Sequence, residues 1–384
     1  MLRQVTLGPR PITRVCWSVL FFLGFLSCQS PSGNKTKSEH LQWQGSTMGT
    51  TYLVKVAVAR GEDGAVLNFD STGKTYSLEL EDPIQIQKGI DSVLEVVNAS
   101  MSTYRKESLL SRWNASASGM KVDTMLLRNF KVSLSVHAES GGAFDPTVFP
   151  LVQAWGFGPQ ARQNPPDSAR IKALLPLIGL NKVRIYGDSL GKSIPGLMLD
   201  FSAIAKGYGV DAVGWYLESL GIANYLVEIG GEVRARGRRE SGQIWSIAVE
   251  KPIDDPTGTQ RGILLQLPLQ NRSMASSGNY RNYYKLNGRK VVHTIQPRTG
   301  YPEPSDVLGV TILAPDCMTA DAYATACMAM GYRASRAMIE RHPELEAIWI
   351  MSPADTTRQD FRIEYSTGLQ SLLASRSTSS SLAP

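Results

Sequence analysis

The stretch HTIQPRTGYPEPSDVLGVTILAPDCMTADAYAT, residues 293–325, decides the fold because it joins a strand directly to a helix that carries polar side chains. Its middle part, residues 307–314, is rich in β-branched residues and lies between Pro304 and Pro315, which predicts a strand. Residues 318–330 contain helix formers throughout and end before a glycine, which predicts a helix. The succession indicates a chain that uses both kinds of element.

Two side chains of this helix, Asp321 and Thr325, are one turn apart and therefore share a face. A carboxylate and a hydroxyl so placed suit a hard cation such as Mg²⁺, and the helix N-terminus beside them attracts phosphate. The alternative is a capped helix in which Asp321 complements the helix dipole. His293 is a possible proton carrier. A lone histidine is usually structural, and the loop neighbours Thr299 and Gly300 raise the odds that this one faces a cleft.

Length and composition restrict the class of protein. The 384 residues are long for one domain, although one domain of two lobes is compatible with them. Hydrophobic residues make up 42% and charged residues 19%, which predicts a globular core. The net charge is +6, but the basic residues are scattered among acids, so we expect no nucleic-acid partner. Cys317 and Cys327 are expected to be buried and unbridged.

The N-terminus has the features of a processing segment. Three arginines precede an apolar run, residues 15–26, that is too short to span a bilayer, which predicts a signal peptide over residues 1–27. The string FLSC, residues 25–28, resembles a bacterial lipoprotein cleavage site, with Cys28 as the lipidated first residue. Residues 28–40 are then expected to be a flexible tether. The chain would be exported, lipid-anchored to a bacterial membrane and facing the periplasm.

Elsewhere, helical stripes alternate with groups of strand-like segments. Helices are expected over residues 84–100, 123–140, 168–179 and 206–220, and strands over residues 41–58, 183–186, 196–201, 225–229, 244–250, 263–267 and 290–295. Groups of helices beside groups of strands predict an α+β fold. The Ser-rich end, residues 369–384, is expected to be disordered.

Three further strings place polar groups beside predicted turns. Residues 141–147 (GGAFDPT) follow a helix end where a loop can approach a planar ligand, although a helix stop and turn also explains them. Residues 200–209 (DFSAIAKGYG) enter a helix with Lys206 available to an anion, and the alternative is a capped helix with a solvated lysine. Residues 230–232 (GGE) either let a ligand approach the backbone or form a tight turn.

Taken together, these strings resemble ApbE-type FAD:protein FMN transferases in their order and spacing. The resemblance rests on residues 45–52, 102–104 with 111–114, 143–147 with 155–158, 200–211, 230–232, 276–280, 293–300 and 320–325. It implies an ApbE-type, T-fold-like α+β catalytic domain of two lobes over residues 41–368. It also implies an enzyme that splits the pyrophosphate of FAD with Mg²⁺, transfers FMN to a Thr hydroxyl of an exported flavoprotein and releases AMP.

The resemblance also assigns roles to single residues. The residues that would contact FAD are Met48, Tyr104, Ala143, Phe144, Asp145, Asp200, Lys206 and Ile295, with Tyr104 or Phe144 suited to stacking. Ala203, through its carbonyl, would hold Mg²⁺ together with Asp321 and Thr325, whereas family members often carry Asp where this chain has Ala324. His293 would be the general base for the attacking threonine.

Two alternatives share parts of this prediction. An Mg²⁺-dependent FAD pyrophosphatase would use water in place of the threonine. A flavin-binding lipoprotein without turnover would need neither a metal nor a base, so Asp321, Thr325 and His293 argue against it. The partner expected for the transferase is an exported or membrane redox flavoprotein with an acceptor Thr.

Overall fold

The computed structural model describes residues 37–373 apart from residues 64, 71, 73, 81, 160–163, 254–261, 280–282, 287–288, 304, 354–360 and 372. All of the described residues belong to one compact unit. The predicted signal peptide, Cys28 and residues 374–384 lie outside them, so the predictions made there stay predictions.

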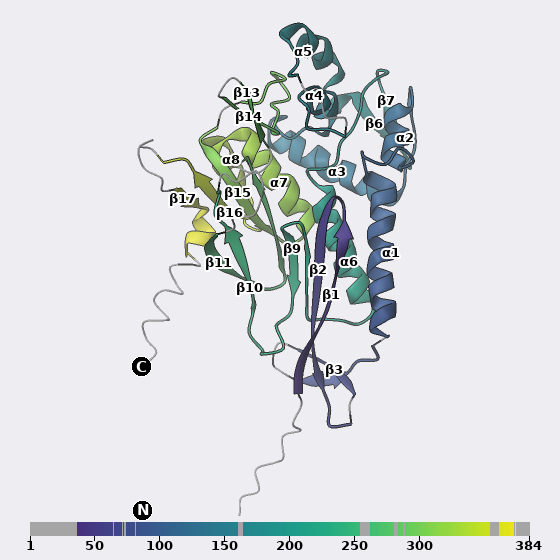
Figure 1. Cartoon of the computed structure of the whole chain (residues 1–384), viewed down its shortest axis with the longest axis vertical. Helices are drawn as coiled ribbons and strands as arrows, with labels where there is room; N and C mark the ends of the chain where they lie inside the picture. Colours follow the sequence, from purple (N-terminus) through teal and green to yellow (C-terminus); the bar gives the residue numbers. More distant parts are fainter. Residues whose placement is uncertain are drawn as a thin grey trace, which may run out of the picture. The chain divides into compact units, whose positions relative to one another are not determined.

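A ten-stranded antiparallel sheet forms the centre of this unit (Figure 1). Its strand order is β17-β16-β15-β12-β9-β8-β2-β3-β4, and β1 also pairs with β2. The bounds of the strands are β1 Lys37–Thr47, β2 Thr50–Arg60, β3 Val66–Phe69, β4 Thr75–Ser77, β8 Tyr225–Ile229, β9 Glu232–Arg236, β12 Arg272–Gly278, β15 Val307–Ala314, β16 Glu346–Met351 and β17 Arg362–Tyr365. Strands far apart in the sequence therefore become neighbours, as β2 and β8 do.

Four long helices lie together on one side of the sheet (Figure 1): α1 Pro83–Met101, α3 Thr124–Glu139, α6 Ala205–Ser219 and α7 Cys317–Met330. Helices α6 and α7 bury residues around most of their circumference, because each packs on the sheet and on other helices. Gly207 makes their close approach possible, since a Cβ at this position would lie 2.3 Å from the carbonyl oxygen of Cys317. Cys317 and Cys327 are buried free thiols, as predicted.

A two-stranded ribbon covers part of the opposite face of the sheet. It consists of β10, Trp245–Glu250, and β11, Ile263–Leu269. Trp245 and Val249 of β10 and Leu267 of β11 share a core with Val233 and Ile348 of the sheet. Helices, sheet and ribbon thus form three layers.

A second lobe stands at the end of the sheet where the 293–297 loop lies. It contains α4 Phe149–Ala154, α5 Ser168–Leu174, β13 Tyr283–Leu286, β14 Arg289–Val292 and the 3₁₀ turns Pro146–Val148 and Leu175–Leu177. Leu151, Trp155, Ile171 and Ile295 form part of its own apolar cluster. The remaining elements share the core of the long helices, for example through Trp113 and Leu190: α2 Leu109–Ala115, β5 Gly119–Lys121, β6 Val183–Tyr186, β7 Ser189–Lys192 and the 3₁₀ turn Leu180–Lys182. The predicted α+β class is confirmed.

The single strand expected over residues 41–58 is instead a hairpin. Strand β1 pairs with β2 along its whole length, and Met48 and Gly49 form the two-residue turn with φ angles of 49° and 74°. Such turns need positive φ at both central residues. A Met-Gly pair does not indicate this in the sequence as an Asn-Gly pair would. Because β1 begins at Lys37, residues 37–40 belong to the sheet and not to the expected tether.

The strand expected over residues 196–201 is absent. The partner of β6 is β7, which begins only three residues after β6 ends. Residues 197–201 run without a ladder, although Asn114 binds the backbone of Leu199 through both its side-chain oxygen and its nitrogen. A side chain thus satisfies the backbone groups that a neighbouring strand would otherwise have bonded.

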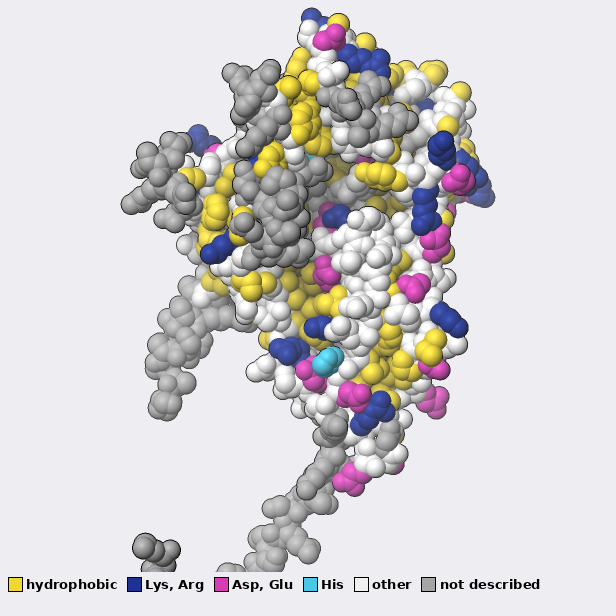
Figure 2. Space-filling view, viewed as in Figure 1, with side chains coloured by type: hydrophobic (Ala, Val, Ile, Leu, Met, Phe, Trp, Pro, Cys, Tyr) yellow, Lys and Arg dark blue, Asp and Glu magenta, His cyan; other side chains and the backbone are white. Residues whose placement is uncertain are grey.

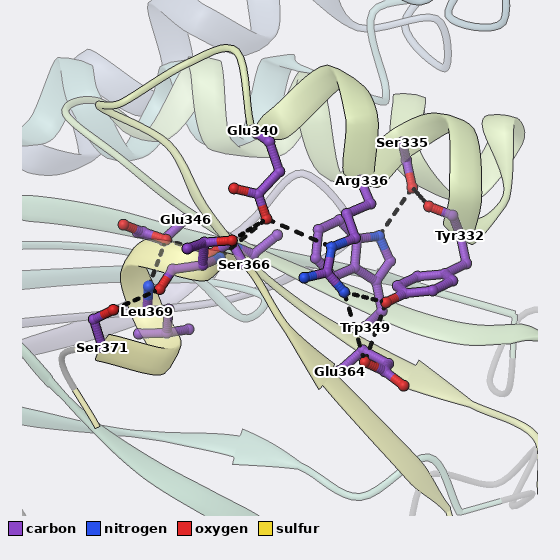
Figure 3. Close-up of polar contacts among 12 residues, drawn as sticks. Tyr332, Ser335, Arg336, Glu340, Glu346, Trp349, Glu364, Ser366, Leu369 and Ser371 are labelled. Carbon is purple, nitrogen blue, oxygen red and sulfur yellow. Dashed lines mark hydrogen bonds and ion pairs between the residues drawn. The ribbon is translucent and has the colours of Figure 1, made fainter. Parts of the chain in front are cut away.

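The C-terminal region is ordered further than predicted. Residues 367–371 are helical, and Leu369 is 1% exposed in the core between ribbon and sheet. Its N–H donates to Glu346 of β16 at 2.8 Å (Figure 3). Helix α8, Tyr332–Ile339, contributes Arg336 to the neighbouring polar contacts in the same view. The expected disorder from residue 369 is therefore wrong at its start, because one buried leucine anchors a segment of polar composition.

Candidate functional site

A cavity of about 810 Å³ lies between the two lobes and brings together most of the predicted site residues. Those that line it are Tyr104, Ala143, Phe144, Asp145, Asp200, Ala203, Lys206, His293, Ile295, Asp321 and Thr325. They come from the loops after α1, α3 and β14, from the segment that leads into α6, and from helices α6 and α7. Figure 2 shows basic and acidic side chains close together near the centre of this face.

Asp321 is held at the cavity by helix α6. It is the fifth residue of α7 and is 5% exposed, and its Oδ2 accepts the N–H of Gly207 at 3.0 Å. Burial raises the pKa of this carboxyl, although Lys206 and the Gly207 N–H act against the shift. The alternative of a first-turn acid that complements the dipole is wrong, because the N-cap is Asp316, whose side chain accepts the N–H of Thr319.

The N-terminus of α7 is occupied by protein groups. Both oxygens of the buried Asp211 accept backbone N–H groups there, from Cys317 at 3.0 Å and from Met318 at 2.9 Å. Asp316 accepts the N–H of Thr319. The expectation that this helix end attracts phosphate is therefore wrong, since its donors already have carboxylate partners.

Lys206 forms an ion pair with Glu232, the first residue of β9. Glu232 is 2% exposed, and its second oxygen, Oε2, has no hydrogen-bond partner among the described residues. Burial, together with the neighbouring Asp321 carboxylate, raises the pKa of Glu232 despite Lys206. Lys206 is thus neither a solvated lysine nor a free anion ligand, and it stands between two buried carboxylates.

Glu232 is a site residue that the sequence analysis named only as part of a three-residue string and did not single out. It follows Gly230 and Gly231, whose φ angles of 59° and 105° form the turn from β8 to β9. The tight-turn reading of this string is confirmed, and the turn also lines the cavity. The signal available in the sequence was an acidic residue at the start of a strand, directly after a Gly-Gly turn.

Two aromatic residues were suggested for stacking, and the structure distinguishes them. The Tyr104 side chain is 70% exposed at the cavity, whereas Phe144 is only 3% exposed. Partial burial and the nearby Asp200 carboxylate raise the pKa of Tyr104. Asp200 itself accepts the N–H of Ser202 at 2.9 Å and also its hydroxyl. Tyr104 is therefore the ring with a face available to a ligand.

Asp145 lines the cavity, and its carboxylate is hydrogen-bonded to neighbouring protein groups. Its Oδ1 accepts the N–H and hydroxyl of Thr147 at 2.8 and 2.6 Å, and its Oδ2 accepts the N–H of Leu180 at 3.3 Å. Burial raises the pKa of this carboxyl, and the Thr147 hydrogen bonds oppose the shift. Its carboxylate thus joins the turn at Thr147 to the turn at Leu180 and is largely engaged by protein groups.

His293 lies at the cavity where the chain leaves β14. Its ring meets that of Phe157 edge to face, with 6.2 Å between centroids. The next residue, Thr294, donates to the side chain of Asn279 at 2.9 Å, which fixes the loop. The half-buried imidazole is therefore positioned by packing and by its neighbour, as a base must be.

Two expected positions lie away from the cavity. Met48 is in the β1–β2 turn, where its side chain packs against Gly209 of α6, so it does not line the cavity. Ala324 is fully buried in the helical core and does not line it either. Alanine has no side-chain oxygen, so residue 324 supplies no metal ligand to the cavity.

The metal-binding potential of the site rests on a mixed set of oxygens. Within the described ranges, no three His, Cys, Asp or Glu side chains gather closely enough to hold a metal by themselves. Asp321, Thr325 and Ala203 nevertheless all line the cavity, and Ala203 has only a backbone carbonyl to offer. Carboxylate, hydroxyl and carbonyl are all hard donors of the kind that Mg²⁺ accepts alongside water.

Comparisons with known proteins identify the family of the chain. The model of the ApbE family matches residues 48–349. The FAD:protein FMN transferase of Vibrio cholerae is 40% identical over 312 residues, covering 80% of this chain and 87% of that protein. The FAD:protein FMN transferase of Haemophilus influenzae is 35% identical over 322 residues, covering 82% of this chain and 86% of that protein.

Solved structures extend the likeness to the fold. Flavin transferase ApbE from Vibrio cholerae has a TM-score of 0.74 at 36% identity, covering 87% of this chain and 99% of that chain. The apo flavinyl transferase ApbE from Pseudomonas stutzeri has a TM-score of 0.73 at 32% identity, covering 87% and 97%. On its sequence, its fold and the residues gathered at its cavity, the chain belongs to the ApbE family.

Proposed function

We propose that the chain is an FAD:protein FMN transferase, which moves the FMN part of FAD to a threonine hydroxyl of another protein and releases AMP. The observation that carries the proposal is that His293 lines the same cavity as Asp321 and Thr325, although they come from separate parts of the fold. That one cavity offers a proton acceptor and oxygen ligands, as phosphoryl transfer requires. The names of the relatives support the same activity.

The cavity suits a flavin dinucleotide in size and lining. Its volume of about 810 Å³ falls in the range of roughly 300–1,000 Å³ that is common for small-molecule sites. Tyr104 offers an exposed ring for stacking, and Ala143 and Ile295 add apolar lining. Phe149 and Phe157 add apolar walls that keep water from the reacting groups.

Magnesium fits the oxygens beside this lining. Asp321, Thr325 and the Ala203 carbonyl would hold the ion, which normally keeps several waters. Glu232 has a buried oxygen without a hydrogen-bond partner among the described residues, and burial raises the pKa of both Glu232 and Asp321. Two buried carboxylates that resist ionisation are what a nearby cation would stabilise in the charged form. When bound, Mg²⁺ would neutralise charge that develops on the pyrophosphate.

The remaining chemistry belongs to the protein and the two substrates. The threonine oxygen of the acceptor attacks the phosphorus of the FMN half, and the bond from that phosphorus to the bridging oxygen breaks. The bridging oxygen leaves with AMP, while His293 takes the hydroxyl proton. Lys206 places a positive charge between the buried carboxylates and thereby limits the repulsion that the pyrophosphate would meet.

We also propose that the enzyme is exported and lipid-anchored through Cys28, facing the periplasm, and that its acceptor is an exported or membrane redox flavoprotein. The charged start, the short apolar run and the string FLSC support this proposal. No helix within the described residues is long and apolar enough to cross a membrane. Cys28→Ser should abolish labelling by a fatty-acid probe, and equal label in variant and wild type would contradict the anchor alone.

Incubation with FAD and Mg²⁺ tests the activity. The purified protein is assayed with and without an exported redox flavoprotein expressed free of flavin, and both AMP and protein-bound flavin are measured. We expect AMP and covalently bound flavin in equal amounts when the acceptor is present. AMP with free FMN, whether or not the acceptor is added, would instead identify a pyrophosphatase, and bound but uncleaved FAD would identify a carrier.

A further inference from the structure

We propose that the acceptor protein docks by adding an extended, threonine-bearing segment as a strand to the open edge of β10. The inference rests on the proposed transferase function and names how its protein substrate reaches the cavity. It is carried by the position of β10 and by the pairing of β10 with β11, neither of which the reaction on FAD uses.

A second cavity, of about 370 Å³, adjoins the main one along β10. Trp245 and Ser246 line only this second cavity, Ile247 and Ala248 line both, and Val249 with Glu250 lines only the main cavity. The two cavities therefore form one groove that follows the strand from its first residue to the catalytic centre. At about 3.3 Å per residue, six residues of strand give a groove of roughly 20 Å.

The groove runs along an edge of β10 and not along one of its faces. Trp245 and Val249 are buried toward the sheet, whereas Ser246 and Ala248 are exposed on the opposite face, yet residues of both faces line the groove. No residue of β11 lines either cavity. The side of β10 that meets the groove is thus the side away from β11.

Pro268 of β11 indicates which backbone groups face that edge. It lies opposite Ser246, and it has no N–H to complete the two-bond exchange of a hydrogen-bonded antiparallel pair. Ser246 and Pro268 are therefore a non-hydrogen-bonded pair. By alternation, Trp245, Ile247 and Val249 bond to β11, while Ser246 and Ala248 direct their N–H and C=O groups into the groove.

The same proline makes the two outer edges of the ribbon different. Its ring faces the outer edge of β11, where proline hinders the addition of another strand. Strand β10 has no proline, and within the described residues it pairs only with β11. The edge left open to pairing is the one that leads to His293 and Asp321.

The opposite wall of the groove suits a polypeptide. It comes from the sheet face next to β10, with Leu53 and Lys55 of β2 and Leu226 and Glu228 of β8. Alternate side chains of an added strand would meet these apolar and charged groups while its backbone bonded to β10. An extended segment does not need a folded surface around its threonine. It can therefore deliver that one side chain into an enclosed site.

Proline substitution tests the edge. Ser246 lines only the second cavity, and Ser246→Pro removes an N–H that faces the groove and fills the edge with a ring. The matched control is Gln266→Pro, an exposed position opposite Ala248 whose N–H faces the outer edge of β11. Loss of about one backbone hydrogen bond and the steric block should raise the KM for the acceptor about tenfold or more in Ser246→Pro. The KM for FAD and the thermal midpoint should match those of Gln266→Pro.

Hydrogen exchange gives a readout that needs no variant. The acceptor that takes FMN from the wild-type enzyme should slow amide exchange in residues 245–250 and leave residues 263–269 unchanged. If both proline variants have the same KM for the acceptor, or if residues 245–250 show no protection, the docking proposal is overturned, and transfer by the wild type still upholds the function. If the wild type shows no transfer, both proposals are overturned. If the wild type is a dimer that Ser246→Pro converts to a monomer, the edge serves self-association and not acceptor docking.

Discussion

The backbone N–H of Gly207 donates to the carboxylate of Asp321 at 3.0 Å, which joins helix α6 to helix α7 at the wall of the catalytic cavity. A side chain at residue 207 would collide with the carbonyl of Cys317 and would crowd Asp321 itself. The carboxylate is thus positioned by a close helix contact that only glycine permits.

Substitution of Asp321 separates its charge from its structural hydrogen bond. Asp321→Asn keeps an oxygen that can accept the Gly207 N–H but removes the charge, whereas Asp321→Ala removes both. We expect both variants to lose FAD cleavage, and we expect only the Ala variant to be clearly destabilised, by about 1–3 kcal/mol for the unpaired buried N–H. AMP release at limiting Mg²⁺ and thermal unfolding measure the two effects. Near wild-type cleavage by Asp321→Asn would refute the metal role.

His293→Ala should separate chemistry from binding. An imidazole with an ordinary pKa near 6.5 can take the hydroxyl proton of the acceptor but is not needed to hold FAD. Transfer to protein should fall by about 10²–10⁴-fold, while the Kd for FAD changes little. Stopped-flow flavin fluorescence and quantified covalent flavin measure these two quantities. If transfer continues at the wild-type rate between pH 6 and 8, His293 is structural.

Glu232 should make the stability of the protein depend on pH. Because burial raises its pKa in the folded state, the folded protein binds this proton more tightly than the unfolded chain does. The stabilisation is fully present below the ordinary pKa of 4.5 and is lost as pH rises through the raised value. Without divalent cations, denaturant unfolding should therefore show a lower free energy at pH 8 than at pH 5.

The matched variants for this effect are Glu232→Gln and Glu107→Gln. The first removes the buried titrating group and should flatten the change in unfolding free energy between the two pH values. The second changes an exposed side chain and should leave the change as in the wild type. An unaltered pH dependence in Glu232→Gln would show that another group is responsible.

Because Leu369 anchors the C-terminal segment, we expect substitutions at Leu369 and at Ser371 to differ sharply in their effect on the free energy of unfolding. Leu369→Ala removes a side chain that is 1% exposed in the core between ribbon and sheet and should cost about 2–5 kcal/mol. Ser371→Ala changes an exposed residue of the same helical segment and should stay within about 0.5 kcal/mol of the wild type. Urea unfolding monitored by tryptophan fluorescence compares them, and similar midpoints would contradict an anchoring role.

Local sequence was enough for the elements whose residues carry strong signals of their own. Strand β15 has the predicted bounds, and helix α7 begins one residue early and ends where predicted, because Gly331 takes a φ of 73° that favours glycine. Helix α3 likewise lies between Asp123 and Ser140 as its caps. Propensity, capping and glycine conformation are short-range effects, so they can be predicted without knowledge of the fold.

Sequence by itself therefore determined the α+β class, the family resemblance and most of the residues that reach the cavity. Only the tertiary structure decided their relations: Lys206 meets Glu232 from a strand 26 residues away, Asp211 occupies the start of α7, and Met48 turns away from the cavity. The reason is that these contacts arise from the packing of two helices on a sheet whose neighbouring strands are distant in the chain. Burial and pairing of charges depend on that long-range packing, which no local pattern contains.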